Sequence, residues 1–443
     1  MNSAEHKPKA FDIWNGSLLD HYDATAPNML DRWHPVMAWW DARAQGDADP
    51  YAKVTNSEIG PRITATDRSG KRIEGLNFAT QDCLNLSRHP AVRRAAADAV
   101  AQGGLHAGGS AALMGLSAGL VRLEQTIARF LDCDDATVLP TGWAAGYGVI
   151  RALVRPQDHV VIDALAHACL FEGAKAATGN VHQFDHNNID DLVQRLTRIR
   201  AAHPAAGILV ATESLFSAQS DSPDLAAMMQ ICRDTGALFL VDTAHDLGAT
   251  GPTGRGEIEK QGVLRAIDVI MGSFSKTFAS AGGFVASNHP ALKTALRLGC
   301  GPSRYSNALS PVQSAVVQSC FDLVSSPTGS QLRSDLQHNS ALLRSALRHE
   351  GFDILGGPSP IVPVVLGDVP LSRRITSNLF ALNALANLVE FPSVPQTACR
   401  WRLQVMAGHS DDDILDFVSR AVTARRQALD APPPGTVIEN FAL

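Results

Sequence analysis

One lysine follows a predicted strand and is surrounded by small hydroxyl side chains. The run 268–278, DVIMGSFSKTF, reads as an apolar strand that ends at Ser273 and leads through Ser275 to Lys276. A lysine that burial desolvates has a lowered pKa, and its neutral amine can form a Schiff base with an aldehyde. Taken alone, the motif favours a surface lysine in a Gly- and Ser-rich loop.

An acidic residue and a histidine stand upstream, just past another buried run. In ALFLVDTAHD, Asp242 and His245 follow an apolar strand. A carboxylate at the end of a buried strand needs a cationic partner or a solvated position. Enzymes that use pyridoxal 5'-phosphate (PLP) combine a lysine Schiff base with an acidic residue at the protonated pyridine nitrogen. Because Asp242 precedes Lys276 in this order, the sequence no longer favours a surface lysine and instead predicts PLP bound covalently to Lys276.

Three further turns carry residues that suit this cofactor. Gly142 and Trp143 open a predicted helix after a strand, where free backbone N–H groups bind phosphate. His167 stands at a strand-to-helix junction and suits stacking on a planar ring, although a capping histidine shows the same pattern. Ser217 follows the run GILVATE and suits either a hydrogen bond to a ring substituent or a cap of the next segment.

The runs that must position these residues are short and apolar. They are ATVLP, HVVIDA, GILVATE, ALFLVDTA and DVIMGSFS, with helical stretches between them. Strands buried on both faces have this unbroken apolar character, so a mostly parallel sheet covered by helices is expected. Upstream, RITATD and KRIEGLNFA predict a hairpin that turns at Ser69 and Gly70.

Changes of pattern divide the chain into three expected parts. Residues 1–60 are irregular and rich in Trp, Asp and Pro, which predicts an arm on a neighbouring domain or subunit, or a lid over a substrate tail. Residues 61–310 contain the sheet. Residues 311–443 show two long helical stretches, three strands and a closing helix, which predicts a smaller α+β domain.

Composition and charge exclude several classes of protein. The 443 residues carry a formal charge of −6, which argues against binding nucleic acid through a basic face. Seven cysteines without a C-x-x-C pair argue against a disulfide framework or a zinc ribbon, and we expect no metal. No signal peptide and no apolar run of about 18 residues is present, so we expect a cytoplasmic protein without a membrane span.

Together these segments resemble the α-oxoamine synthases of the PLP fold type I superfamily. That family includes 8-amino-7-oxononanoate synthase, 2-amino-3-ketobutyrate CoA ligase, 5-aminolevulinate synthase and serine palmitoyltransferase. The resemblance runs from about Asn77 to about His409, and its most specific parts are D-x-x-H-x-x-G-x-x-G-x-x-G-R-G from Asp242 and S-F-S-K-T-F around Lys276. It implies a large domain with a seven-stranded, mostly parallel sheet and helices on both faces, plus a smaller C-terminal α+β domain.

The resemblance also implies a role for each candidate residue. Lys276 would hold PLP and move the α-proton of the substrate, and Asp242 would pair with the pyridine nitrogen. His245 would bond the phenolic oxygen, and His167 would stack on the ring. The cofactor site would be completed, chiefly at the phosphate, by Gly142, Trp143, Ser273 and Ser275.

Two more roles concern the substrate and a second subunit. Arg402 would bind the carboxylate of the amino acid through its guanidinium fork. Ser306 and Asn307 would complete the phosphate site of a neighbouring subunit, so a homodimer with shared active sites is expected. The family reaction is a Claisen-type condensation of an amino acid with an acyl thioester, usually with loss of CO2.

Four positions depart from the family pattern: Asp82, Cys83, Ala111 and Leu120. We interpret them as altered substrate choice, which leaves open whether CoA or an acyl carrier protein carries the acyl group. Asp82 is predicted to contact the substrate, with a surface carboxylate as the alternative. Two other functions stay open: a PLP enzyme that needs no thioester (aldolase, decarboxylase or aminotransferase), and an inactive partner subunit, against which Lys276 argues. A dinucleotide-dependent dehydrogenase fails because no G-x-G-x-x-G follows the first strand.

Overall fold

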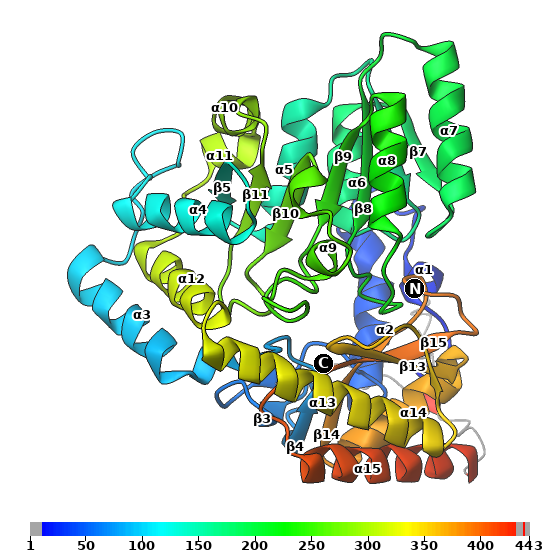
Figure 1. The fold of residues 1–443 in the computed structure, drawn as a ribbon. Helices are drawn as coiled ribbons and strands as arrows, with labels where there is room; N and C mark the ends of the chain where they lie inside the picture. The colour runs from blue at the N-terminus through cyan, green and yellow to red at the C-terminus, as the bar shows by residue number, and fades with distance from the viewer. Residues whose placement is uncertain (1–10, 431–436, 439–443) are drawn as a thin grey trace, which may run out of the picture. The chain divides into compact units, whose positions relative to one another are not determined.

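The computed structural model describes residues 11–430 and 437–438, which form two compact units (Figure 1). The first unit joins the residues up to Thr80 to those from His338 onward, and the second comprises Gln81–Gln337. These boundaries differ from the expected divisions near residues 60 and 310. The hairpin at 62–78 belongs with the C-terminal strands because its second strand pairs in parallel with the strand at 384–389.

The second unit is built on a seven-stranded sheet in the order β5-β11-β10-β9-β8-β6-β7. Its strands are β5 (Asp135–Leu139), β6 (His159–Asp163), β7 (Val181–Phe184), β8 (Ile208–Glu213), β9 (Leu238–Asp242), β10 (Val269–Ser273) and β11 (Gly283–Ser287). Only β11 runs antiparallel to its neighbours. The mostly parallel sheet is thereby confirmed, and all five apolar runs read from the sequence are strands.

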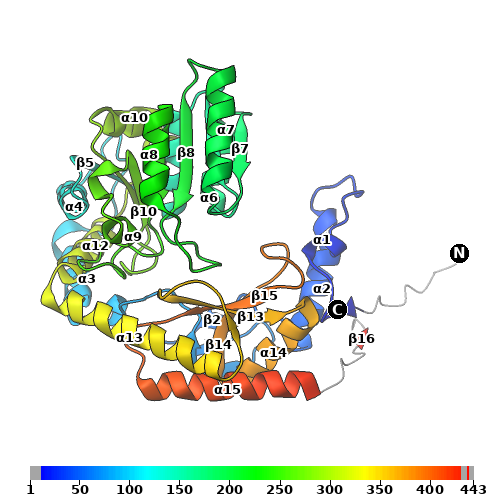
Figure 2. The ribbon, with the colours of Figure 1, turned by 45° about the vertical axis from the view of Figure 1, so that its right-hand side comes forward.

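Helices cover this sheet, as Figure 2 shows for α7 and α8. The helices are α3 (Pro90–Gly103), α4 (Ala118–Phe130), α5 (Gly142–Leu153), α6 (Ala168–Ala177), α7 (Ile189–Ala202), α8 (Leu225–Thr235), α9 (Glu257–Lys260), α10 (Ala291–Gly299), α11 (Gly301–Tyr305), α12 (Pro311–Val324) and the start of α13 (Pro327–His349), with 3-10 turns η2 (Leu86–Arg88) and η3 (Leu264–Ala266). Apolar residues of α5, α6 and α10 form one core with the strands. Such burial keeps the strand ends, and the side chains that follow them, in fixed positions.

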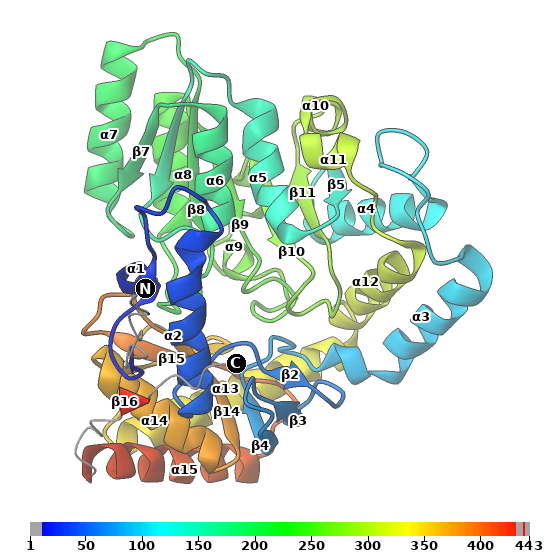
Figure 3. The ribbon, with the colours of Figure 1, turned by 180° about the vertical axis from the view of Figure 1, so that it is seen from behind.

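The first unit contains a second seven-stranded sheet, in the order β12-β13-β15-β14-β4-β3-β2. Its elements are β1 (Phe11–Asp12), α1 (Leu18–His21), η1 (Asp31–Trp33), α2 (His34–Gln45), β2 (Val54–Thr55), β3 (Arg62–Thr66), β4 (Arg72–Phe78), β12 (Asp353–Ile354), β13 (Ile361–Gly367), α14 (Val369–Ala381), β14 (Ala384–Val389), β15 (Cys399–Gln404), α15 (Asp411–Asp430) and β16 (Val437–Ile438). Figure 3 shows the predicted hairpin β3–β4 beside β2, and Gly70 turns it with a φ of 90°.

The N-terminal segment is more ordered than expected. Trp39 of α2 is 4% exposed and packs in an apolar cluster with Phe11 and Ile13. Arg373 of α14 donates hydrogen bonds to the carbonyls of residues 14, 15 and 16. The segment therefore packs on the C-terminal part of its own unit. None of the described helices is long and apolar enough to cross a membrane.

Candidate active site

A cavity of about 240 Å³ in the second unit gathers most of the predicted residues. It lies where β5, β6, β9 and β10 end, and these strands run in one direction, so the side chains that follow them meet at one edge. Its lining is Thr141, Gly142, Trp143, His167, Cys169, Asp242, Ala244, His245, Met271, Ser273, Ser275, Lys276, Ala281 and Gly282.

Lys276 is held by a tight loop after β10. The backbone N–H of Phe274 donates to the carbonyl of Gly282 at 3.0 Å, which closes the loop on itself. The rings of Phe274 and Phe278 are fully buried on either side of the lysine and anchor the loop in the core. Gly282 has a φ of 109°, and a Cβ there would come within 2.8 Å of the Phe274 ring. The half-buried lysine is therefore fixed at the cavity by its neighbours.

Asp242 is the buried carboxyl of the cavity, with 4% of its surface exposed. The backbone N–H of Ala244 donates to its Oδ1 at 2.8 Å. Burial raises the pKa of Asp242, while the charge of Lys276 and the Ala244 N–H act in the opposite sense. An acid and an amine thus face one small cavity, as the sequence predicts.

Asp246 anchors the turn that carries His245. Its carboxyl accepts hydrogen bonds from Ser214 Oγ at 2.7 Å and from the Glu257 N–H at 2.7 Å. Burial raises the pKa of Asp246 to about 7, and these hydrogen bonds oppose the rise. Gly256, with a φ of 76°, is required because a Cβ would overlap the Asp246 carboxyl. The glycine-rich motif thus encloses a buried acid beside His245.

The amino end of α5 forms the third wall of the cavity. Thr141 caps this helix, and its Oγ1 accepts the Ala144 N–H at 3.0 Å. Gly142 lies so close to Ser273 that a Cβ would stand 2.5 Å from its Oγ. A bare backbone with free N–H groups and the positive end of the helix dipole suits a phosphate.

His167 both caps a helix and faces the cavity. Its Nδ1 accepts the Cys169 N–H at 3.3 Å, at the start of α6, and stands 3.0 Å from the Cys169 Sγ. The Trp143 ring meets the imidazole edge to face, with centroids 5.8 Å apart. The capping role and the predicted stacking role of His167 are therefore compatible.

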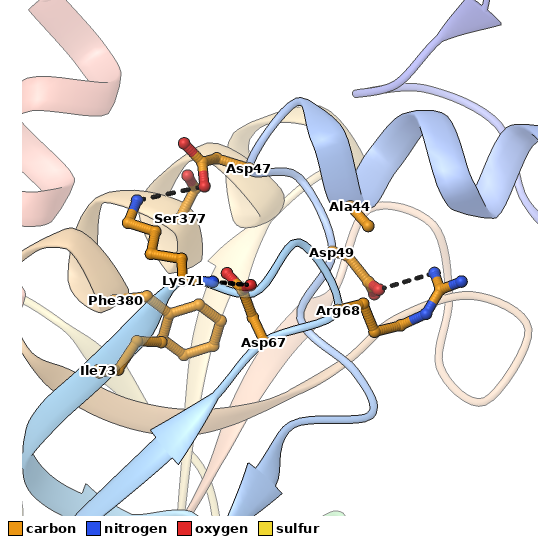
Figure 4. A pocket seen from close by; sticks show the side chains of 9 residues that line it. All are labelled: Ala44, Asp47, Asp49, Asp67, Arg68, Lys71, Ile73, Ser377 and Phe380. Carbon is orange, nitrogen blue, oxygen red and sulfur yellow. Dashed lines mark hydrogen bonds and ion pairs between the residues drawn. The ribbon is translucent and has the colours of Figure 1, made fainter.

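A second, smaller cavity of about 20 Å³ lies in the first unit (Figure 4). Four of its five charged side chains form two ion pairs: Lys71 with Asp47 at 3.2 Å and Arg68 with Asp49 at 3.3 Å. The fifth, Asp67, accepts the backbone N–H of Lys71 at 2.9 Å, and the cavity is too small for an organic ligand.

Comparison with known proteins agrees with this geometry. Residues 73–420 match the family model of aminotransferase class I and II. The chain belongs to this family. It is 33% identical over 383 residues to 8-amino-7-oxononanoate synthase of Geobacter sulfurreducens, covering 86% of this chain and 94% of that protein. It is 31% identical over 384 residues to serine palmitoyltransferase of Sphingomonas paucimobilis, covering 86% and 89%.

A solved structure and a third relative point to the same group of PLP-dependent enzymes. A serine palmitoyltransferase with its PLP internal aldimine superposes with a TM-score of 0.84 at 28% identity, covering 90% of this chain and 99% of that one. The mouse mitochondrial 2-amino-3-ketobutyrate coenzyme A ligase is 30% identical over 374 residues, covering 84% and 88%. This family member is accordingly a PLP-dependent enzyme of the α-oxoamine synthase type.

The residues of the cavity fit PLP. The Cβ-free approach of Gly142 to Ser273 leaves the backbone N–H groups of α5 open to a phosphate. Asp242 would face the pyridine nitrogen, and Lys276 would hold the aldehyde carbon. Ser275 Oγ lies 2.8 Å from Ser273 Oγ, so both hydroxyls would lie near a phosphate held by the amino end of α5.

Three predicted cofactor residues are not among those lining the cavity. Ser217 is half-buried in the loop after β8. Ser306 is exposed, and its Oγ donates to the Pro302 carbonyl at 2.6 Å. Asn307 is exposed and its side-chain amide bonds His106 Nε2 at 2.9 Å. Their cofactor roles stay predictions.

The predicted substrate residues have different settings. Asp82 is 3% exposed, so a surface carboxylate is wrong. It accepts the N–H groups of Leu86 at 2.9 Å and Ser87 at 3.1 Å and thus holds the turn η2. Arg402 lies in β15 of the first unit, in register with Pro363 of β13.

Other substituted positions are buried too. Leu120 is 0% exposed on the inner side of α4, and Ala111 is 8% exposed. Cys83 is 5% exposed, and burial raises the pKa of its thiol to about 12. None of these three residues is among those that line the cavity.

Several lining residues were not predicted from the sequence. Thr141 precedes the recognised glycine, and Cys169 follows the recognised histidine by two residues. Met271 lies inside β10, where nothing distinguishes it from a core residue. Across the described ranges, no group of three or more His, Cys, Asp or Glu side chains is arranged to hold a metal ion.

Proposed function

We propose that this enzyme condenses an amino acid with an acyl thioester to form an α-amino ketone, with loss of CO2. The observation that carries the proposal is the cavity that Lys276 and the buried Asp242 line together with the amino end of α5. The names of three relatives support it, since they are an 8-amino-7-oxononanoate synthase, a 2-amino-3-ketobutyrate coenzyme A ligase and a serine palmitoyltransferase.

The chain's own groups divide the work of this reaction. PLP, when bound, supplies an electron sink for the carbanion at the Cα of the amino acid. Lys276 takes and returns the proton at that carbon through Nζ. Asp242, buried and negative, stabilises positive charge at the pyridine nitrogen. His167 limits the tilt of the ring, and His245 bonds its oxygen. Because all four side chains line the same cavity, they are already close together before substrate arrives.

Substrate contacts are proposed for two residues. Arg402 would bind the amino-acid carboxylate bidentately. Asp82 would act near the acyl group, although its two oxygens already hold η2, which favours an indirect role. The acyl carrier is CoA or an acyl carrier protein, and the rewritten residues beside the site would select between them.

A homodimer is proposed as the working form. Large apolar side chains are exposed near Ser306 and Asn307, at the end of α11 and on the loop between α3 and α4: Tyr305 at 79%, Leu105 at 69%, Leu113 at 77% and Met114 at 89%. Single monomers seldom leave such a group uncovered. A second copy of this chain would cover it and bring Ser306 and Asn307 to the partner's phosphate site. A cytoplasmic location also stays a prediction; it is supported by the seven cysteines, each of which is free.

The decisive experiment loads the protein with PLP and measures thiol release from acyl-CoA and from acyl carrier protein. Glycine, alanine and serine are added singly, and Lys276→Ala is the matched control. We expect release that depends on one amino acid and is absent in the control. Turnover of an amino acid without any thioester would instead establish an aldolase, decarboxylase or aminotransferase.

A further inference from the structure

A second buried carboxyl stands directly beside Asp242. Glu213 ends β8 as Asp242 ends β9, and the two residues are register partners on neighbouring parallel strands. Register partners on adjacent strands point to the same face of a sheet. Glu213 is 3% exposed and Asp242 is 4% exposed. Two buried carboxyls side by side do not both ionise readily.

The surroundings favour the negative charge on Asp242. Asp242 receives the Ala244 N–H and faces the positive Lys276 and the His167 ring. These contacts stabilise an anion at the position where PLP needs one.

The surroundings of Glu213 are less favourable to charge. The His167 backbone N–H donates to it and Lys276 is near, but the carboxylates of Asp163 and Asp242 face it from the ends of β6 and β9. Burial, reinforced by the charge of Asp242, raises the pKa of Glu213 well above its ordinary value.

We propose that Glu213 is a positioning residue of the cofactor site, which carries a proton, leaves the negative charge to Asp242 and holds the backbone of His167. It acts through these two residues and does not line the cavity. This inference rests on the proposed function only for the identity of the cofactor. It assigns a different protonation state to each of two adjacent acids.

The first test reads the proton directly. Infrared difference spectra of wild type against Glu213→Gln, in water and in deuterated water at neutral pH, report the C=O stretch of a protonated carboxyl. We expect a band in wild type that shifts in deuterated water, disappears in Glu213→Gln and persists in Asp242→Asn. No band at Glu213 would overturn the proposal, as would a band that Asp242→Asn removes and Glu213→Gln leaves.

The second test separates the neutral acid from a mere space-filler. Gln can accept the His167 N–H as a neutral group, whereas Leu cannot. Glu213→Gln should therefore change the PLP dissociation constant by less than about threefold, and Glu213→Leu should weaken binding by roughly tenfold. Equal losses in both variants would contradict a neutral Glu213.

Both readouts are independent of turnover. A protein that binds PLP and shows the Glu213 band but never consumes a thioester would refute the proposed reaction and leave this assignment intact. A working condensation with an ionised Glu213 would do the opposite.

Discussion

His186 joins two aspartates that lie far apart in the sequence. Its Nδ1 is 2.9 Å from Asp163 Oδ1 at the end of β6, and its Nε2 is 3.1 Å from Asp221 Oδ2 in the loop after β8. The same loop contains Ser217 and is closed by the Phe216 N–H, which donates to the Asp221 carbonyl at 2.9 Å. We predict that His186→Gln loosens this loop and destabilises the protein.

The magnitude follows from the histidine's proton affinity. Burial lowers the pKa of His186, but the hydrogen bonds and charges of Asp163 and Asp221 outweigh it and raise the pKa to about 9. Relative to an unfolded pKa of about 6.5, the raised pKa corresponds to a stabilisation of the folded state on the order of 3 kcal/mol. Because the Asp221 side chain is 34% exposed, screening by solvent reduces this stabilisation to about 2 kcal/mol.

The sign of the pH dependence is fixed by the raised pKa. The stabilisation is fully present below pH 6.5 and is lost as the pH rises through about 9. Urea unfolding of wild type and His186→Gln should differ by about 2 kcal/mol at pH 6 and converge towards pH 10. Hydrogen exchange should rise in peptides that cover residues 216–221.

The matched control is His349→Gln, because the His349 side chain is 86% exposed. It should leave the free energy of unfolding unchanged within about 0.5 kcal/mol. A difference between wild type and His186→Gln that is the same at pH 6 and pH 10 would refute the ion-pair explanation.

Three further predictions follow from single contacts. Gly142→Ala places a Cβ 2.5 Å from Ser273 Oγ and should weaken PLP binding about tenfold in a fluorescence titration, whereas the control Gly179→Ala, where a Cβ would meet nothing within 4 Å, should bind PLP as wild type does. Asp246 has a folded pKa of about 7, above its unfolded value, so stability falls as pH rises from about 4 to 7; Asp246→Asn should flatten that part of a Tm-against-pH curve, and an unchanged slope would refute it. Arg373→Met leaves the buried Glu390 without its 2.7 Å partner and should cost about 3 kcal/mol, with faster hydrogen exchange at residues 14–16; protection equal to wild type would contradict it.

The cavity was predictable because its chemistry lies at strand ends. Asp242, Lys276 and His167 each follow an apolar run that is a strand in the structure, so strand prediction also placed the side chains. Glu213 ends its strand in the same way, but only the register with Asp242 shows that two acids share one site.

The elements that were missed lack a local signal. The strand β7 is short and polar, β11 begins with glycine, and α14 has a polar sequence with a proline in its first turn. The hairpin β3–β4 joins the C-terminal sheet through β14, more than 300 residues away, which no local pattern reveals. The buried state of Asp82 also depends on backbone N–H groups that fold around it.

The most direct test of the central claim is chemical trapping of the cofactor. The protein is loaded with PLP, reduced with borohydride, digested and analysed by peptide mass spectrometry, with Lys276→Ala treated in parallel. We predict a phosphopyridoxyl group on the peptide that contains Lys276 and none on that peptide in the variant. A label on a different lysine, or no label in a folded protein saturated with PLP, would contradict the account.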